Sequence, residues 1–316
     1  MKLRINKSWA AGVFALAVSA VAFAYPDKPV QYIIPFAAGG ESDIAARLQQ
    51  QTFKTRFNQD MVVVNKPGAG GGLAWSQMNA MPGDGHTIVG VNLPHIVLQP
   101  LEGTVDYKTE DVTPIYFFHY TPDAIVVAQD SPHKTFADLV KAAREKPGAI
   151  SFAGSGTNSA NHLAHERLNR EFKIKTTYVP FKGTGDMVSS ILGNHVSAAM
   201  SYSTLAIQQK GKMRMLAVAT VQRVPQFPDV PTFKELGVDW VDGAYRGIGV
   251  PKSTPPDVRK KVSDMMDAIN KDPELRKKMV DGGFEVTDIS LDKMPAFMKE
   301  RTQEYLNTAK QMGLVK

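Results

Sequence analysis

Two glycine-rich segments of the sequence each join an apolar run of strand character to a stretch of helical period. The first segment, Phe36–Asp43, reads Phe-Ala-Ala-Gly-Gly-Glu-Ser-Asp, and the second, Ala153–Asn158, reads Ala-Gly-Ser-Gly-Thr-Asn. Glycine lets the backbone come close to a ligand. The free amides and the dipole of a helix start favour a negative group. Both segments are therefore predicted to bind a carboxylate or a phosphate.

A third glycine-bearing turn, Phe181–Asp186, also precedes a helical stretch and could supply hydrogen-bond donors to a more distant part of the same ligand. Two helix starts that face each other across a cleft would hold one carboxylate from both sides. Turns of this kind are common in α/β folds, so an ordinary structural role for all three remains open at this stage.

The same residues give little support to catalysis. Gly154-Ser155-Gly156 lacks the spacing of a nucleophile elbow, and His162 and His165 lack the H-E-x-x-H spacing of a zinc site. No nucleotide-binding fingerprint follows Gly68. Asp43 could be a catalytic base, but without a visible nucleophile we favour an acid that orders the loop or binds a ligand amine or hydroxyl.

Alternating strands and helices must position these segments. We expect strands at 30–36, 61–64, 87–91, 125–128, 150–153 and 177–180, and helices at 42–57, after Gly72, and at 159–172. Thr135 and Asp138 resemble a capping box ahead of a further helix. This alternation is typical of parallel sheets covered by helices.

The C-terminal part is predicted to be helical, with a stripe of apolar residues through Val258, Val262, Met265, Met266 and Ile269 and a last helix over 291–313. The methionines are interpreted as core residues. No linker separates the parts of the chain, so we expect it to cross between two lobes near Pro122–Ala124 and again near Tyr245–Gly247. The predicted division is 25–124 plus 247–316 for one lobe and 125–246 for the other.

The N-terminus carries Lys2, Arg4 and Lys7 ahead of an apolar stretch that ends in Ala22-Phe23-Ala24. This pattern predicts a secretory signal peptide over 1–24, cleaved after Ala24. The apolar stretch is shorter than the ~20 residues of a membrane-spanning helix, which disfavours an uncleaved anchor. We therefore predict a periplasmic protein.

Composition narrows the function further. Loss of the three basic residues in 1–24 lowers the formal net charge from +6 to +3. The remaining basic residues are spread among acids, as in 271–278. This mixed charge pattern argues against nucleic-acid binding. The chain contains no cysteine, so disulfides and thiol chemistry are excluded. No cofactor and no metal are expected.

Several motifs, in order along nearly the whole mature chain, resemble the Bug family of periplasmic receptors. They are Tyr25–Val30, Pro35–Asp43, Asn65–Gly71, Pro82–Thr87, Arg223 with Pro228–Thr232, and Arg246–Pro251. The resemblance implies an α/β fold of the periplasmic binding protein type (type II, Venus-flytrap), in which each of two lobes is a sheet flanked by helices. It also implies a solute-binding protein, not an enzyme, that delivers a small di- or tricarboxylate or aromatic acid to the permease subunits of a tripartite tricarboxylate transporter.

In that family, loops that match Phe36–Asp43 and Ala153–Asn158 hold a ligand carboxylate, partly through water. Variable positions at the far end of the ligand would correspond to residues such as Lys182, Thr184 and Arg246. Arg246 would favour a second carboxylate, although it could equally form a structural hinge pair with Tyr245. The predicted ligand contacts are Phe36, Ala37, Ala38, Gly39, Gly40, Ser42, Asp43, Gly154, Ser155, Gly156, Thr157, Asn158, His162, Lys182, Thr184, Ser201, Tyr202 and Arg246.

The expected protein is a monomer that closes around its ligand. A sensory binding protein with a signalling partner would use the same cleft, and a hydrolase is the less favoured alternative. The sequence does not specify which carboxylate is bound.

Overall fold

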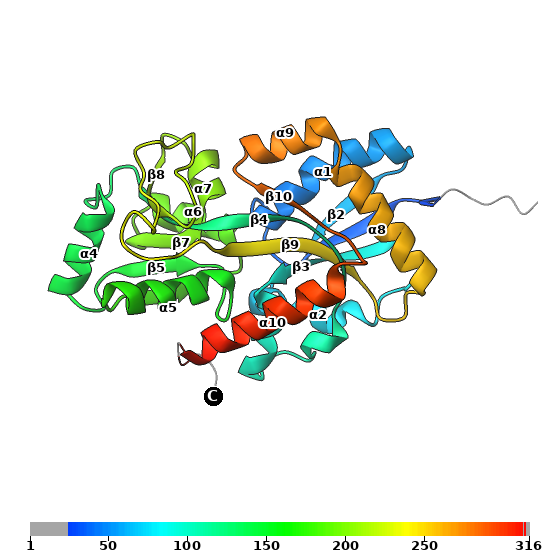
Figure 1. The fold of residues 1–316 in the computed structure, drawn as a ribbon, viewed down its shortest axis with the longest axis horizontal. Helices are drawn as coiled ribbons and strands as arrows, with labels where there is room; N and C mark the ends of the chain where they lie inside the picture. The colour runs from blue at the N-terminus through cyan, green and yellow to red at the C-terminus, as the bar shows by residue number, and fades with distance from the viewer. Residues whose placement is uncertain (1–24, 312, 314–316) are drawn as a thin grey trace, which may run out of the picture.

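The structure, a computed structural model, describes residues 25–311 and residue 313. Helices and strands alternate along the chain, and the strands form one curved, mixed sheet that passes through both ends of an elongated molecule (Figure 1). The predicted signal peptide lies outside the described residues. None of the described helices is long and apolar enough to cross a membrane.

One half of the sheet is built from the N-terminal strands. β1 (Val30–Ile34) pairs in parallel with β2 (Met61–Asn65) and with β3 (Thr87–Leu93), and β9 (Gly243–Val250) pairs antiparallel with β3. The helices of this half are α1 (Glu41–Phe57), α2 (Gly72–Met78), α3 (His95–Leu98), α8 (Pro256–Asn270), α9 (Pro273–Asp281) and α10 (Met294–Gln311). Short 3₁₀ turns occur at Ala69–Gly71, Gln99–Glu102 and Thr109–Asp111.

The other half contains β7 (Ala198–Tyr202), which pairs in parallel with β5 (Ser151–Gly154), and β5 pairs in parallel with β6 (Thr177–Pro180). β8 (Met213–Val218) lies antiparallel to the end of β4 (Thr113–Ala128). The helices here are α4 (Phe136–Glu145), α5 (Ala160–Phe172), α6 (Thr184–Leu192) and α7 (Ser203–Gln208). They gather at the left of Figure 1, whereas α1, α2 and α8 lie toward the right and α10 runs along the lower edge between the two halves.

β4 belongs to both halves. It pairs with β9 as far as Pro122 and with β7 from Asp123 onward, and β10 (Glu285–Ile289) pairs with its first part. β9 runs alongside it between the halves (Figure 1). The backbone amide of Asp123 donates to the carbonyl of Asp242, 3.0 Å away, which fastens the two strands at this point.

Most predicted elements are present, with shifts of a few residues at their ends. The last helix is shorter than the predicted 291–313. β4 differs more, because only its end, 125–128, was predicted. Pro114 and Pro122 break the strand pattern in the sequence, since proline cannot donate to a ladder. The structure accommodates this stretch with register shifts near Pro114–Tyr116 and Phe117–His119.

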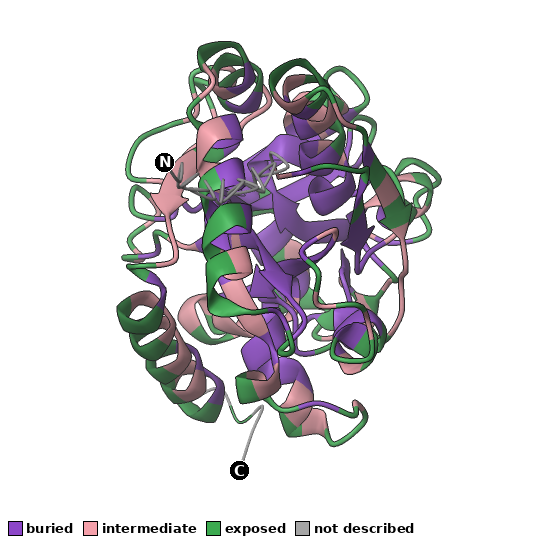
Figure 2. Ribbon diagram, turned by 90° about the vertical axis from the view of Figure 1, so that its right-hand side faces the viewer, coloured by how far each residue is buried: buried purple, intermediate pink, exposed green. Residues whose placement is uncertain are grey.

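Local sequence explains how several helices begin and how they pack. The predicted capping box of α4 is confirmed, because the Thr135 hydroxyl accepts from the Asp138 amide and the Asp138 carboxylate accepts from the Thr135 amide. The methionines of α8 are core residues, as predicted: Met265 and Met266 are buried. Figure 2 shows the same principle, with most strands buried inside the molecule and the helices exposed mainly on their outer faces.

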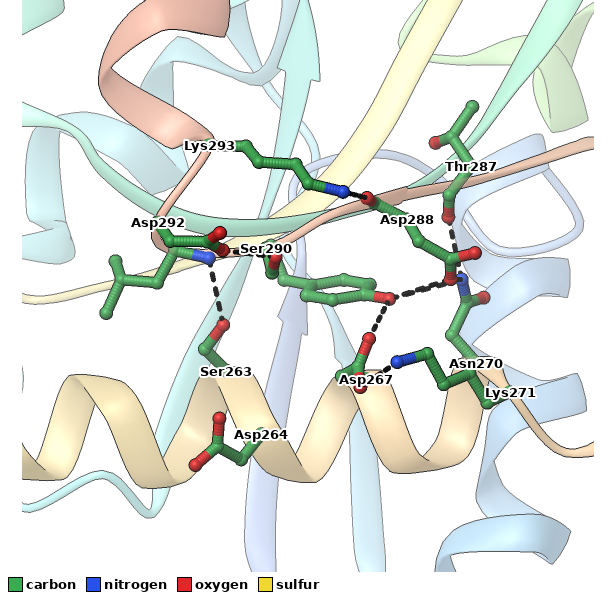
Figure 3. A network of polar contacts seen from close by, with 12 residues as sticks. Ser263, Asp264, Asp267, Asn270, Lys271, Thr287, Asp288, Ser290, Asp292 and Lys293 are labelled. Carbon is green, nitrogen blue, oxygen red and sulfur yellow. Dashed lines mark hydrogen bonds and ion pairs between the residues drawn. The ribbon is translucent and has the colours of Figure 1, made fainter.

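A polar network fastens the C-terminal elements to β4. The Tyr116 hydroxyl lies 3.1 Å from Asp267 Oδ1 on α8 and 3.0 Å from Asp288 Oδ1 on β10. The Asn270 side-chain amide donates to Asp288 Oδ1 and to the Thr287 carbonyl, each at 2.7 Å (Figure 3). These contacts hold α8 and β10 in register against β4.

Candidate functional site

A small cavity lies where segments of the two halves meet, and polar side chains dominate its walls. It has a volume of ≈ 10 Å³, which is about the space of one water molecule. Its lining residues are Phe36, Glu41, Ser42, Asn92, His95, Ser155, Thr184, Tyr202 and Arg246. The cavity therefore lies at the junction of the predicted loops.

Hydrogen bonds between the halves close this cavity. The amide of Glu41, at the start of α1, donates to the Thr184 hydroxyl of α6 at 3.1 Å, and the Thr204 hydroxyl of α7 donates to Glu41 Oε1. On another side, the Asn158 side-chain amide lies 3.4 Å from the Leu98 carbonyl. The structure is thus a closed arrangement in which the two halves touch directly.

Two glycines allow the loop before α1 and the start of α6 to approach each other closely. A Cβ added to Gly40 would lie 3.0 Å from the Thr184 hydroxyl, and one added to Gly185 would overlap the Ala38 carbonyl oxygen. The turn before α6 therefore packs directly against the loop before α1. A side chain at either glycine would separate the halves.

Asp43 orders the first loop. Its Oδ2 accepts hydrogen bonds of 2.9 Å from the Gly39 amide and from Arg47 Nε. Burial would raise the pKa of Asp43, but these hydrogen bonds and the Arg47 charge hold it below its usual range. Gly39 has φ +73°, which glycine adopts without strain. Asp43 does not line the cavity, so its contacts match the loop-ordering interpretation.

Two further amides of the first loop are already bonded within the protein. The Gly40 amide donates to the Ala37 carbonyl at 3.3 Å, and the Glu41 amide donates to Thr184. Ala37, Ala38, Gly39 and Gly40 do not line the cavity, whereas Phe36 and Ser42 do.

The second junction is likewise held by its own hydrogen bonds. Asn161 Oδ1 accepts from the amide and the hydroxyl of Ser155, at 3.0 and 2.6 Å, and His162 Nδ1 accepts from the Asn158 amide at 3.1 Å. Of this group only Ser155 lines the cavity. The predicted contacts Gly154, Gly156, Thr157, Asn158 and His162 lie around it.

The remaining predicted contacts divide in the same way. Thr184, Tyr202 and Arg246 line the cavity, Lys182 is exposed, and Ser201 is buried next to Tyr202 without lining it. The structure thus brings Phe36, Ser42, Ser155, Thr184, Tyr202 and Arg246 together. Direct ligand contact for each of the other residues stays a prediction.

Arg246 lies on β9, and its guanidinium packs 4.6 Å from the centre of the Tyr202 ring. Nη1 donates to the Thr121 hydroxyl and to the Ala244 carbonyl, the latter at 3.1 Å. Nε has no partner within the protein. A buried arginine with an unused donor is suited to a carboxylate.

The nearby histidines do not add positive charge. Burial, together with the charge of Arg246, lowers the pKa of His95 to about 3 and holds the pKa of His119 well below its usual range. Both rings are therefore neutral near pH 7, and Arg246 supplies the positive charge of the cavity.

Sequence reasoning missed three lining residues, namely Glu41, Asn92 and His95. Glu41 lies inside the predicted loop, but its side chain was not among the predicted ligand contacts. Asn92 lies near the end of β3 and His95 follows the strand, whose carboxyl end lies beside that of β1. That neighbouring strand end is a usual place for ligand contacts in α/β sheets and was the available signal.

The family model described as "Tripartite tricarboxylate transporter family receptor" matches residues 45–314. The chain belongs to this receptor family. The family consists of periplasmic binding proteins and not of enzymes, and the resemblance to Bug receptors seen in the sequence is confirmed. The match begins two residues after Asp43, so it does not include the first loop.

Individual relatives agree with this assignment. A protein of Agrobacterium vitis, encoded in the TAR-I ttuE-ttuC' intergenic region, is 31% identical over 82% of this chain and 76% of its own. The periplasmic binding protein BugD is 29% identical, with a TM-score of 0.85 over 92% of this chain and 100% of its own. Rpa4515 of R. palustris, with adipate, is 25% identical, with a TM-score of 0.84 over 92% of this receptor and 98% of its own chain. The predicted two-lobed α/β fold of the periplasmic binding proteins is confirmed for this receptor.

Proposed function

We propose that this receptor captures a small carboxylate in the periplasm and delivers it to the membrane subunits of a tripartite tricarboxylate transporter, without chemical turnover. The observation that carries the proposal is the buried Arg246 side chain, which lines a closed polar cavity and whose Nε has no partner in the protein. A ligand carboxylate would satisfy that donor through a charge-assisted hydrogen bond. The adipate reported with Rpa4515 is a ligand of the same class.

Capture requires the halves to move. The cavity of ≈ 10 Å³ is too small for an organic acid, so the loop before α1 and the turn before α6 separate to admit one and then close around it. The rotation occurs about β4 and β9, with the lobes divided as 25–124 plus 247–316 and 125–246. Closure follows ligand binding only if the ligand binds the closed form more tightly than the open one.

The mature receptor begins at Tyr25 after cleavage behind Ala24, and it acts as a monomer whose closed form is recognised by the permease. Mass spectrometry of the protein exported by its own leader tests the cleavage site. Size measurement by light scattering tests the monomeric state.

Thermal denaturation with a panel of mono-, di- and tricarboxylates tests the proposed function. The protein is first unfolded and refolded to remove any ligand that co-purified. A carboxylate at one hundred times its dissociation constant should stabilise the folded form by about 2.7 kcal/mol and raise the melting temperature. The ligand should be recovered unchanged. If no carboxylate shifts the melting temperature while ester or amide substrates are hydrolysed, the receptor proposal is wrong.

A further inference from the structure

Glu41 is the second charged side chain in the wall of the cavity, opposite in sign to Arg246. It is 3% exposed, and its Oε1 accepts from the Thr204 hydroxyl, but its Oε2 has no partner in the protein. The cavity is the space next to this carboxyl group. An unpaired acceptor at such depth is costly unless something donates to it.

Glu41 and Arg246 do not satisfy each other. Among the ion pairs of residues 25–311, none joins these two side chains, although the charge of Arg246 partly offsets the effect of burial, which raises the pKa of Glu41. Arg246 instead uses Nη1 on Thr121 and Ala244. The cavity therefore presents an unused donor and an unused acceptor of opposite charge on the same small volume.

We propose that Glu41 makes this receptor selective for amino-substituted carboxylic acids, with the ligand ammonium on Glu41 Oε2 and a ligand carboxylate on Arg246. The inference rests on the proposed function and specifies the class of carboxylate. A zwitterion pairs with both charges. An unsubstituted acid leaves Glu41 without a donor, and a diacid brings a like charge toward it, which costs free energy in a buried site.

The other unpartnered groups on the wall are compatible with such a ligand. The Tyr202 hydroxyl and His95 Nδ1 have no partner in the protein, and both groups are uncharged near pH 7. They can therefore accept from or donate to the ligand without changing the charge balance set by Glu41 and Arg246.

The alternative role of Glu41 is purely structural, as a contact that holds α1 against α6 and α7 through Thr184 and Thr204. The Glu41→Gln variant separates the two roles. Its side-chain oxygen can still accept from Thr204, and its backbone amide is unchanged, but the negative charge is gone.

The experiment is calorimetric titration of refolded wild type and Glu41→Gln with matched pairs of acids that differ only in the amine. The pairs are aspartate and succinate, glutamate and glutarate, and β-alanine and propionate. In at least one pair, wild type should bind the amine-bearing acid about tenfold or more tightly than its partner. Glu41→Gln should lose about tenfold or more for that acid and little or nothing for the amine-free one. Glu145→Gln, on the exposed end of α4, is the control and should behave as wild type.

The outcomes distinguish this inference from the proposed function. If amine-free acids bind wild type as well as their partners, or Glu41→Gln weakens both members of a pair equally, Glu41 is a structural contact and the selectivity proposal is wrong. The same conclusion follows if none of these pairs binds while other carboxylates raise the melting temperature. If no carboxylate of any kind binds, the receptor function itself fails.

Discussion

The Arg246 guanidinium lies between the two strands that connect the halves and stacks on Tyr202, so its position is fixed before any ligand arrives. A pre-positioned planar donor can bind a carboxylate with little loss of side-chain entropy. This position suits Arg246 to the ligand role proposed above, in addition to any role in the hinge.

Arg246→Ala should weaken binding of a diacid more than binding of the matching monoacid, because a monoacid can place its single carboxylate between the loops at 36–43 and 153–158, whereas a diacid also places its second carboxylate on Arg246. A charge-assisted hydrogen bond of about 1.5–3 kcal/mol corresponds to at least about tenfold in the dissociation constant of the diacid. Calorimetric titration of both acids measures the difference. Arg301→Ala is the matched control, since Arg301 stacks on Tyr245 without lining the cavity. Equal losses for diacid and monoacid would remove Arg246 from the site.

At the scale of single residues, the sequence predicted cavity-lining residues where a single physical rule applied. Ser155 and Arg246, which line the cavity, follow from loop geometry and charge. Glu41 does not, because the same position at a helix start argues against an anion while the tertiary structure places it beside an arginine. Only the tertiary structure, which brings distant segments together, shows that Glu41 and Arg246 line the same cavity.

Among the elements, α6 contributes to closing the cavity, because its first residues pack against the loop before α1. Gly185 lies in the first turn of this helix, where an alanine would favour the helix itself by about 0.5–1 kcal/mol. Glycine at this position therefore destabilises the helix slightly, but it allows the two backbones to approach closely.

Gly185→Ala should leave the protein folded but weaken ligand binding, because the new methyl group would overlap the Ala38 carbonyl and keep the halves apart. Small-angle scattering with saturating ligand should give a larger radius of gyration than that of wild type, and titration should give a higher dissociation constant. Ser189→Ala, on the exposed face of the same helix, serves as the control. A variant that closes and binds like wild type would show that this contact is not needed.

Element boundaries were predictable where helical period and capping agreed, as in α4. The first part of β4 was not, because its prolines and mixed pattern are tolerated only through pairing with β9 and β10, which are more than a hundred residues away. The prediction of alternating elements therefore gave the fold class but not the strand that joins its halves.

At the scale of the whole molecule, two carboxylates lie where β4 and β9 pass between the halves, Asp123 buried and Asp242 half-buried. Burial and the neighbouring Asp242 raise the pKa of Asp123 well above its usual range, and the charge of Arg167 offsets only part of this. Burial also raises the pKa of Asp242. Ionising either group near pH 7 opposes folding.

This effect has a defined sign. The folded-state pKa of Asp123 exceeds the unfolded value of about 3.9. The contribution of Asp123 to the free energy of unfolding is therefore most favourable below about pH 4, and it decreases as the pH rises through the folded-state pKa. Asp123→Asn should therefore melt progressively higher than wild type as the pH increases above about 4, with the smallest difference in acid. Melting curves from acid to neutral pH measure this, with exposed Asp186→Asn as the control. A difference that is constant or shrinks with pH would contradict the assignment.

The two-lobed arrangement was expected from the lack of a linker, and the family comparison confirms the fold. The sequence alone could not show how tightly the halves meet, because that depends on small residues from distant turns, such as Gly40 and Gly185, and not on any local pattern.

β4 contributes its first part to one half of the sheet and its last part to the other half. If either half unfolded alone, it would take part of a strand from its neighbour and expose the interior of that half. We therefore expect the halves to be coupled in unfolding as well as in motion, so that the receptor unfolds as one cooperative unit.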